Sequence, residues 1–351
     1  MSNPERQFHA LTRAELTREC VAHGLSEHQA RLVFQAIHRH GILDPAQMPG
    51  IGASCKTYLR TWPKPQELTL DCVHHAQDLT IKLRLRTPSG DAIESVVIPN
   101  GSRVTLCVSS QVGCAAACSF CHTGTMGLLR NLYAWEICEQ YRLACKVVAQ
   151  TQAQVANITN IVFMGMGEPL HNEAHVLQAC RILSDDLGAG FSRRHIVMST
   201  AGVGNRIRPF WENGLASVAV SLHATTDEVR SQLVPMNRQW NVDILRKILL
   251  DIPWRRKESV IVAYVLLDGV NDSHDDADRL ANWIKGLPAK INLLEFNPFP
   301  NGKFSRASPE KLNAFRGWLD ALGAFNTLRC SRGEDVMAAC GQLAVNKIKS
   351  K

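Results

Sequence analysis

The chain has no long apolar run. Nowhere in its 351 residues is there a stretch of about 18 uninterrupted apolar residues, the length that a membrane-spanning helix needs. The first ten residues, MSNPERQFHA, lack the basic-then-apolar order of a secretory signal. No low-complexity linker interrupts the chain, and no repeat stands out. We therefore expect a cytoplasmic protein that makes no membrane contact.

A compact disulfide framework is also missing, because the twelve cysteines are scattered along the whole chain. In a reducing compartment such thiols stay free, bind metal or take part in chemistry. The net charge of +7 permits a polyanionic partner without requiring one. A hydrophobic content of 45% is enough for a large core, and we expect one large α/β domain with an appendage.

The first 66 residues are expected to form a small helical domain. The segment AELTRECVAHG ends at Gly24, and Ser26 followed by Gln29 matches a capping box before RLVFQAIHRHG. Residues 67–101 then shift to short alternating runs, TIKLRLRT and AIESVVIP, joined by a turn at 88–91. This pattern predicts a β-hairpin connector, and it places Glu94 on one strand face with Val96 and Ile98.

From residue 102 to 351 the sequence alternates strand-like and helix-like segments. Six strand candidates are followed by amphipathic stretches: RVTLCVSS, NITNIVFMG, RHIVMST, ASVAVSLH, SVIVAYVLL and KINLLEF. Such units predict parallel strands with right-handed crossovers that close into a full or partial (β/α) barrel. Active sites of barrels lie at the carboxyl ends of the strands, where Gly165–Glu168, Ser199, Ser221–His223 and Asn297 fall.

Three cysteines follow the first of these strands at spacings of four and three, in VSSQVGCAAACSFCHTGTMG. Structural zinc usually takes four Cys or His ligands, and His122 adjoins Cys121 too closely to complete a tetrahedron comfortably. Cys114, Cys118 and Cys121 could instead hold an iron-sulfur cubane, leaving one iron open to a substrate or cofactor. The alternative is that the three cysteines pack as small apolar residues, but a glycine-rich loop is a poor core segment.

Cys-x3-Cys-x2-Cys after the first barrel strand resembles the radical S-adenosylmethionine (SAM) superfamily. The motifs CVSSQVGC, FMGMGEPL, VSLHA, NPFP and AACGQL are similar to those of the RlmN/Cfr family of RNA adenine methyltransferases, and the resemblance runs from about residue 12 to 346. It implies a partial barrel of six strands, a helical N-terminal accessory domain, and a 4Fe–4S cluster on the three cysteines that chelates SAM.

The resemblance also assigns catalytic roles. Cys340 would take a methyl group from one SAM, a second SAM would yield the radical, and Cys107 would release the product by forming a transient disulfide. Glu94 matches the family's proton acceptor. Without the resemblance, Cys340 and Cys107 would be interpreted as inert core thiols, and Glu94 as a hairpin or edge charge.

The strand-end residues form the expected cofactor rim. Gly-rich GMGEP lets the backbone approach a ligand, and Glu168 offers a carboxylate to the SAM amino group. The residues expected to hold SAM are Gly167, Glu168, Ser199, Ser221, Leu222, His223 and Asn297. His223 taken alone is as well explained by a satisfied core histidine, and we assign it no acid or base role.

RNA is the expected partner, with the target base unpaired or flipped out of its stack. The helical domain is the expected RNA grip, through Arg31, His38, Arg39 and His40, although a solvated helix face explains these residues equally. Arg130 and Asn131 would reach substrate phosphate or cofactor. Lys347, Lys349 and Lys351 form a short basic tail. A flavodoxin or ferredoxin is the expected electron donor, and a monomer the expected state.

Several functional alternatives stay open. The family's carbon-two branch methylates an adenosine of 23S ribosomal RNA and often a transfer-RNA adenosine, whereas the carbon-eight branch modifies the same ribosomal adenosine and confers antibiotic resistance. GEPL and NPFPN resemble the first branch and TGTMGLLRNL the second, and we favour carbon two. A radical SAM enzyme acting on a non-RNA substrate, and an RNA-binding protein with a purely structural cluster, are the remaining hypotheses.

Overall fold

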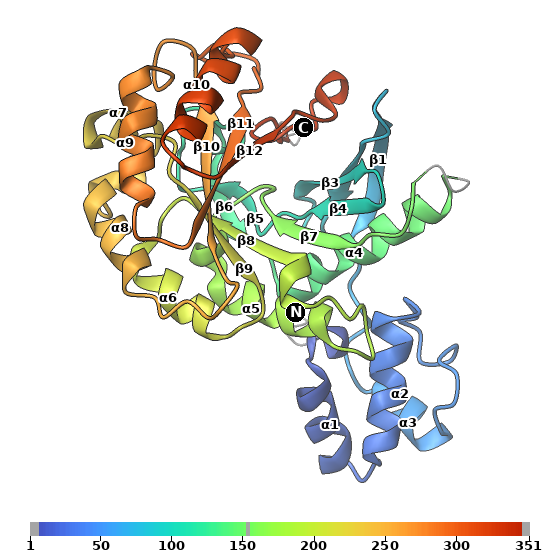
Figure 1. Cartoon of the computed structure of the whole chain (residues 1–351). Helices are drawn as coiled ribbons and strands as arrows, with labels where there is room; N and C mark the ends of the chain where they lie inside the picture. The colour runs from blue at the N-terminus through green and yellow to red at the C-terminus, as the bar shows by residue number, and fades with distance from the viewer. Residues whose placement is uncertain (1–6, 152–154, 346–351) are drawn as a thin grey trace.

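A mixed ten-stranded sheet forms the centre of the computed structural model, which describes residues 7–151 and 155–345 (Figure 1). The strands lie side by side in the order of the chain. They are β1 (Thr69–His75), β2 (Ile81–Arg86), β3 (Ala92–Asn100), β4 (Arg103–Cys107), β7 (Asn160–Phe163), β8 (Ile196–Thr200), β9 (Ser217–Ser221), β10 (Val260–Leu266), β11 (Ala289–Glu295) and β12 (Asn326–Arg329).

The six parallel strands expected from the sequence are confirmed as β4 and β7–β11. The sequence analysis missed β12, a short and half-buried strand that adds a seventh parallel member beside β11. The expected hairpin is confirmed as β2 and β3, and it is continuous with the barrel because β3 pairs antiparallel with β4. β1, which carries mostly polar and exposed side chains, was also missed and pairs with β2.

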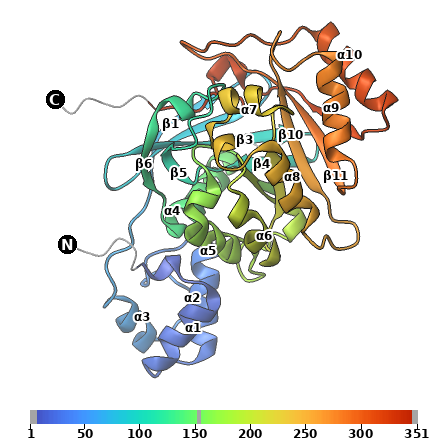
Figure 2. The same ribbon diagram turned by 90° about the vertical axis from the view of Figure 1, so that its left-hand side faces the viewer.

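Helices follow the parallel strands and cover their outer side (Figures 1 and 2). They are α4 (Ala134–Ala149), α5 (Glu173–Ser184), α6 (Gly204–Glu212), α7 (Asp227–Leu233), α8 (Val242–Leu250), α9 (His274–Ile284) and α10 (Pro309–Ala321). Within the described residues no ladder joins β12 to β4, so the barrel is partial, as expected. None of the helices in this part of the chain is long and apolar enough to cross a membrane.

A separate two-stranded hairpin follows β4 directly and lies outside the barrel sheet. It consists of β5 (Gln111–Cys114) and β6 (Gly127–Asn131), which pair antiparallel, and Figure 2 shows it on one flank of the barrel. Gly113 has a φ of 76°, and a Cβ atom there would collide with the carbonyl oxygen of Gly127. Only glycine lets the two strands approach this closely, so the hairpin that carries the cysteine loop depends on it.

The N-terminal helices α1 (Arg13–Ala22), α2 (Glu27–His38) and α3 (Ala53–Leu59) form a lobe that projects from the barrel (Figure 1). The capping box expected at Ser26 is only half formed. Ser26 Oγ accepts from Gln29 N at 3.3 Å, but the Gln29 side chain accepts from Gly52 N at 2.6 Å. The Gln29 amide therefore holds the loop before α3 instead of returning to its own helix end.

The lobe docks on α5 and the loop that follows it. Arg13 pairs with Asp185 at 3.0 Å, Gln178 Nε2 donates to Glu15 at 2.6 Å, and Arg39 donates to the carbonyl oxygen of Asp186 at 2.7 Å. Arg39 is thus engaged within the chain, which weakens its interpretation as an RNA contact.

Two buried histidines at this junction make the protein acid-sensitive. Burial, with the charge of Arg142, lowers the pKa of His9 to about 3, and burial lowers that of His38 to about 3. Both stay neutral when folded but take up a proton when unfolded below their ordinary pKa of 6.5. The free energy of unfolding should therefore fall with pH below 6.5, by roughly 1.4 kcal/mol per histidine for each pH unit.

Urea denaturation at pH 7.5 and 5.5 measures this dependence. His9→Leu should remove about half of it, whereas His28→Leu, at an exposed site on α2, should leave it intact. Equal slopes for His9→Leu and the unaltered protein would show that His9 can be protonated in the folded state.

Candidate active site

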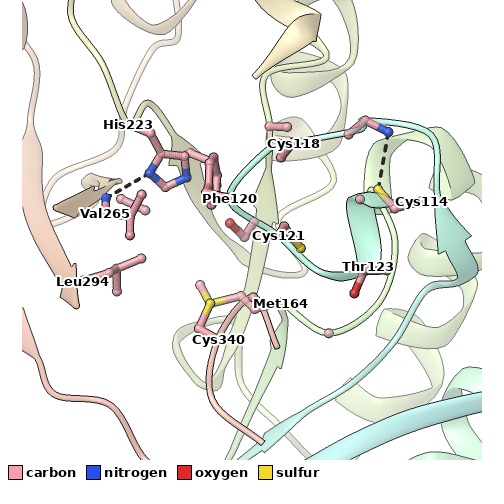
Figure 3. Close-up of a pocket in the computed structure, with 18 of the residues that line it drawn as sticks. Cys114, Cys118, Phe120, Cys121, Thr123, Met164, His223, Val265, Leu294 and Cys340 are labelled. Carbon is pink, nitrogen blue, oxygen red and sulfur yellow. Dashed lines mark hydrogen bonds between the residues drawn. The ribbon is translucent and has the colours of Figure 1, made fainter. Parts of the chain in front are cut away.

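A cavity opens at the carboxyl ends of the parallel strands (Figure 3). It brings together most of the residues expected to form the site: Cys114, Cys118, Cys121, Gly167, Glu168, Ser199, Ser221, His223, Asn297 and Cys340. Cys107, Glu94 and Leu222 do not line it. Segments from opposite ends of the chain thus meet at one place, as the strand-end positions predicted.

The cysteine loop is tightly turned between β5 and β6. Cys121 N donates to Cys118 O at 3.1 Å, and Gly124 N donates to Cys121 O at 3.0 Å. A Cβ atom on residue 124 would lie 2.6 Å from Cys118 O, so any side chain there would force the loop open. The loop geometry therefore depends on Gly124 as well as on the cysteines.

The spacing of the three sulfurs argues against a single metal ion. Their sulfur atoms, all in the described part of the chain, do not all lie within 4.8 Å of one another. Tetrahedral zinc, with Zn–S bonds of about 2.3 Å, would hold its sulfurs roughly 3.8 Å apart. A cubane binds each thiolate to a different iron and accepts the wider spacing. The donor set thus fits a 4Fe–4S cluster with one iron free of protein ligands.

These thiols need a cationic partner to ionise. Burial raises the pKa of Cys114 to about 12. Burial also raises the pKa of Cys118 well above its ordinary value, and the neighbouring Cys121 and Cys114 add to the effect. Metal ions that bind a thiol deprotonate it and supply the missing positive charge. The loop therefore favours cluster binding over three free thiolates.

Glu168, at the end of β7, connects two neighbouring strand ends. Its carboxylate accepts from Leu170 N at 3.0 Å and from Ala201 N at 2.7 Å, and burial raises its pKa to about 7. The glycines before it serve packing. A Cβ atom at Gly165 would lie 2.7 Å from Val108 O, and one at Gly167 would lie 2.6 Å from Gln111 Cβ. The sequence analysis expected these glycines to let the backbone approach a ligand. In the structure they let it approach the segment that follows β4.

His223 and Leu222 follow β9. His223 Nδ1 accepts from Val265 N at 3.0 Å, so the ring is neutral with its hydrogen on Nε2, and burial lowers its pKa to about 3. Its ring packs edge-on against that of Phe120, with the two ring centroids 4.6 Å apart (Figure 3). A neutral, buried ring of this kind is a satisfied core histidine rather than an acid or base. Leu222 is fully buried and does not line the cavity; its backbone N donates to Ala263 O at 3.0 Å and its carbonyl accepts from Arg230 Nε at 3.0 Å.

Residues 333–345, here named the C-terminal strap, bring Cys340 to the cavity. Asn297 Nδ2 donates to Cys340 O at 3.0 Å, and His122 N donates to Gly341 O at 2.7 Å. Burial raises the pKa of Cys121 and Cys107, and the charge of the Cys340 thiolate adds to the effect at both. Cys340 lines the same cavity as Cys121 and Met164 (Figure 3), and its side chain is exposed rather than packed in the core.

Cys107 and Glu94 lie behind the cavity wall. Cys107 ends β4, and burial raises its pKa to about 12. Glu94 is 3% exposed on β3; its carboxylate pairs with Lys82 at 3.0 Å and accepts from Ala344 N of the strap at 3.1 Å. Glu94 therefore anchors the strap in this conformation. All twelve cysteines, each in the described part of the chain, are free thiols.

The sequence analysis missed two charged residues and misplaced a third. Lys82 holds Glu94 and also donates to Met337 O of the strap at 3.1 Å; a lysine within an alternating strand was the only signal. Arg230 is fully buried beside the rim, and its segment DEVRSQL matched no motif. Arg130, expected to contact phosphate or cofactor, instead forms ion pairs with Asp91 and Glu136 at 2.8 and 2.7 Å.

A partial parallel barrel with a three-cysteine loop after its first strand defines a radical SAM protein, and the Radical SAM superfamily model matches residues 108–281. The dual-specificity RNA methyltransferase RlmN of Paracoccus denitrificans (strain Pd 1222) is 41% identical over 96% of this chain and 89% of its own. That of Cereibacter sphaeroides (strain ATCC 17025) is 42% identical over 95% and 88%. A radical SAM methyltransferase from Sphaerobacter thermophilus has a TM-score of 0.88 and 39% identity, covering 95% of this chain and 98% of that one. The chain therefore belongs to the RlmN/Cfr family of radical SAM methyltransferases, which confirms the resemblance.

Removing one cysteine of the loop should abolish cluster binding. Cys118→Ala leaves two thiolates for three irons, so the anaerobically reconstituted variant should contain less than a tenth of the normal iron and sulfide. Cys180→Ala, a buried thiol on α5 outside the cavity, is the matched control and should keep both. Normal iron in Cys118→Ala would mean that the cluster is held elsewhere.

Proposed function

We propose that the protein methylates an adenine carbon of RNA, carbon two, through a methyl group carried on Cys340. The observation that carries the proposal is the exposed Cys340 thiol in the same cavity as Cys114, Cys118 and Cys121, on a strap whose Gly341 carbonyl accepts a hydrogen bond from His122 N. A thiol held against a cluster-binding loop is suited to carry a reacting group. RNA as the substrate class is supported by relatives named RNA methyltransferases.

The target carbon is the reason for the unusual chemistry, because carbon two of adenine is not nucleophilic and cannot take a methyl group by simple displacement. When bound, the reduced cluster and two SAM molecules per turnover supply a methyl group and a 5′-deoxyadenosyl radical. Cys114, Cys118 and Cys121 would hold the cluster. The strand-end residues would hold SAM: Gly167, Glu168, Ser199, Ser221, Leu222, His223 and Asn297.

Cys340 acts first as a nucleophile. Its thiolate would attack the methyl carbon of one SAM, so that a C–S bond forms and S-adenosylhomocysteine leaves, which gives a thioether. Loss of one hydrogen atom to the 5′-deoxyadenosyl radical would turn that methyl into a carbon radical, which would bond to the adenine carbon and link RNA to protein. Asn297 and the backbone of His122 hold the strap so that the sulfur faces the cavity.

Release requires a proton acceptor and a second sulfur. Glu94 would take the proton from the adenine carbon; burial raises its pKa, which favours a carboxyl that can hold a proton. The Cys107 thiolate would then attack the Cys340 sulfur, so that an S–S bond forms and the C–S bond breaks with its electron pair leaving on the base. The unpaired electron of the adduct would return to the oxidised cluster, and the released carbon would take up a proton to become the methyl group. Reduction by a flavodoxin or ferredoxin would restore both thiols.

The remaining assignments are proposed on the same basis. Residues 1–66 would form the RNA-contacting accessory domain, 67–101 the connector that carries Glu94, and 102–351 the catalytic core of a cytoplasmic monomer. The dual-specificity name of the relatives favours the carbon-two branch, which is the one expected to act on both ribosomal and transfer RNA. Lys347, Lys349 and Lys351 lie outside the described residues.

Mass analysis of RNA incubated anaerobically with the reconstituted protein, reductant and methyl-labelled SAM tests the proposal. We expect labelled 2-methyladenosine. Labelled 8-methyladenosine would move the protein to the carbon-eight branch, and 5′-deoxyadenosine without any RNA product would indicate a non-RNA substrate. SAM cleavage that is wholly absent would favour a structural cluster.

Cys340→Ala should separate cofactor binding from methyl transfer. The variant keeps all three cluster ligands, so iron content and SAM binding should stay normal while RNA methylation falls at least a thousandfold. Cys330→Ala, an exposed thiol on the preceding loop, is the matched control and should stay active. Full activity of Cys340→Ala would refute the methyl-carrier role.

Cys107→Ala should stop the reaction one step later. Without a second thiol the linked RNA cannot leave, so a covalent protein–RNA adduct should accumulate and be visible by denaturing gel electrophoresis. Cys138→Ala, a buried thiol on α4, should form none. Recovery of only free RNA from Cys107→Ala would assign release to another group.

A further inference from the structure

Arg230, on α7, uses its entire hydrogen-bonding capacity inside the protein. Nε donates to Leu222 O at 3.0 Å, Nη1 to Asn237 Oδ1 at 2.9 Å and Trp240 O at 3.2 Å, and Nη2 to Ala201 O at 2.9 Å and Ser221 O at 3.2 Å. A guanidinium group has five N–H donors, and all five are taken. The side chain is fully buried, and no carboxylate bonds to it.

Two of the five acceptors of Arg230, the carbonyl oxygens of Ala201 and Ser221, belong to residues that line the cavity. Ala201 follows β8, and Ser221 and Leu222 are at the end of β9. The Ala201 peptide is held from both sides, because its N–H donates to Glu168 Oε2 at 2.7 Å. Glu168 and Arg230 together therefore connect the ends of β7, β8 and β9. Gly202 permits this approach, since a Cβ atom there would lie only 3.2 Å from Arg230 Nη2.

The same helix is attached to the cysteine loop. Ser119, next to Cys118, donates from its backbone N to Leu233 O at 3.0 Å and from its hydroxyl to Gln232 O at 2.8 Å. α7 thus joins the loop that would carry the cluster to the rim that would carry SAM.

We propose that Arg230 is a positioning residue that sets the distance between the cluster loop and the SAM-binding rim. This role follows from the five bonds of Arg230 and from the Ser119 contacts, which make α7 a rigid spacer. The inference rests on the family's cluster and SAM, and not on the RNA target.

Two substitutions test the positioning role. Arg230→Lys keeps the charge but offers at most three donors, so we expect the dissociation constant for SAM to rise at least tenfold. Arg230→Met removes all five donors and should weaken SAM binding at least as much. Arg193→Lys is the matched control: Arg193 lies before β8, away from the cavity, and bonds Glu258 and Ala216 O.

The measurements are SAM binding by equilibrium dialysis, iron content and RNA affinity, all on the anaerobic reconstituted protein. RNA affinity and iron should stay within twofold of normal in Arg230→Lys, and Arg193→Lys should be normal throughout. Native SAM affinity in Arg230→Lys, or equal losses of SAM and RNA affinity, would overturn the positioning role.

A milder variant covers the case in which the Arg230 variants do not fold. Ser119→Ala removes one bond between the cysteine loop and α7 at a partly exposed site, and should weaken SAM binding about threefold without loss of iron. Normal SAM affinity in Ser119→Ala would count against the spacer. None of these measurements depends on RNA methylation. Failure of the proposed function would therefore be detected only in the RNA product assay, and failure of the positioning role only in the SAM-binding measurements.

Discussion

Three neighbouring thiols in one short loop are costly to ionise, and the rest of the structure is organised around them. Burial raises the pKa of each thiol; the neighbouring loop thiols add to the effect at Cys114 and Cys118, and Cys340 adds to it at Cys121. A bound cationic cluster removes this penalty, because it converts three neighbouring thiols into ligands of separate irons. The glycines at 113 and 124 allow the tight loop, and α7 holds it against the rim.

The C-terminal strap is the second element that the site depends on. It crosses from β12 over the cavity and is fixed by residues from three distant parts of the chain: Lys82 and Glu94 on the hairpin, Thr123 in the cysteine loop, and Asn297 after β11. The buried Lys82–Glu94 pair gains from these additional bonds, since an ion pair alone barely offsets its desolvation. Movement of this strap would expose Glu94 and carry Cys340 with it, which couples the two groups that the proposed reaction uses in sequence.

The predictions from sequence succeeded where local patterning is strong. The six apolar strand segments and the hairpin were found because buried parallel strands are near-continuous apolar runs and hairpin strands alternate. β1 and β12 were missed because their side chains are polar or half exposed, so that pairing with a neighbour, rather than burial, makes them strands. Gln29 shows the same limit: its helix start was predicted, but a partner 23 residues away in the sequence took its side chain.

The sequence by itself determined the cysteine spacing, the barrel strands and the motifs that place the chain in its family, because each is encoded in short stretches of residues. Tertiary structure alone decided which side chains face one another. It brought Cys340 into one cavity with the cysteine loop, bound Arg130 to two carboxylates, and enclosed Arg230 among five acceptors. Such contacts join residues that are distant in the chain, and folding selects them through burial and complete hydrogen bonding, which no local pattern records.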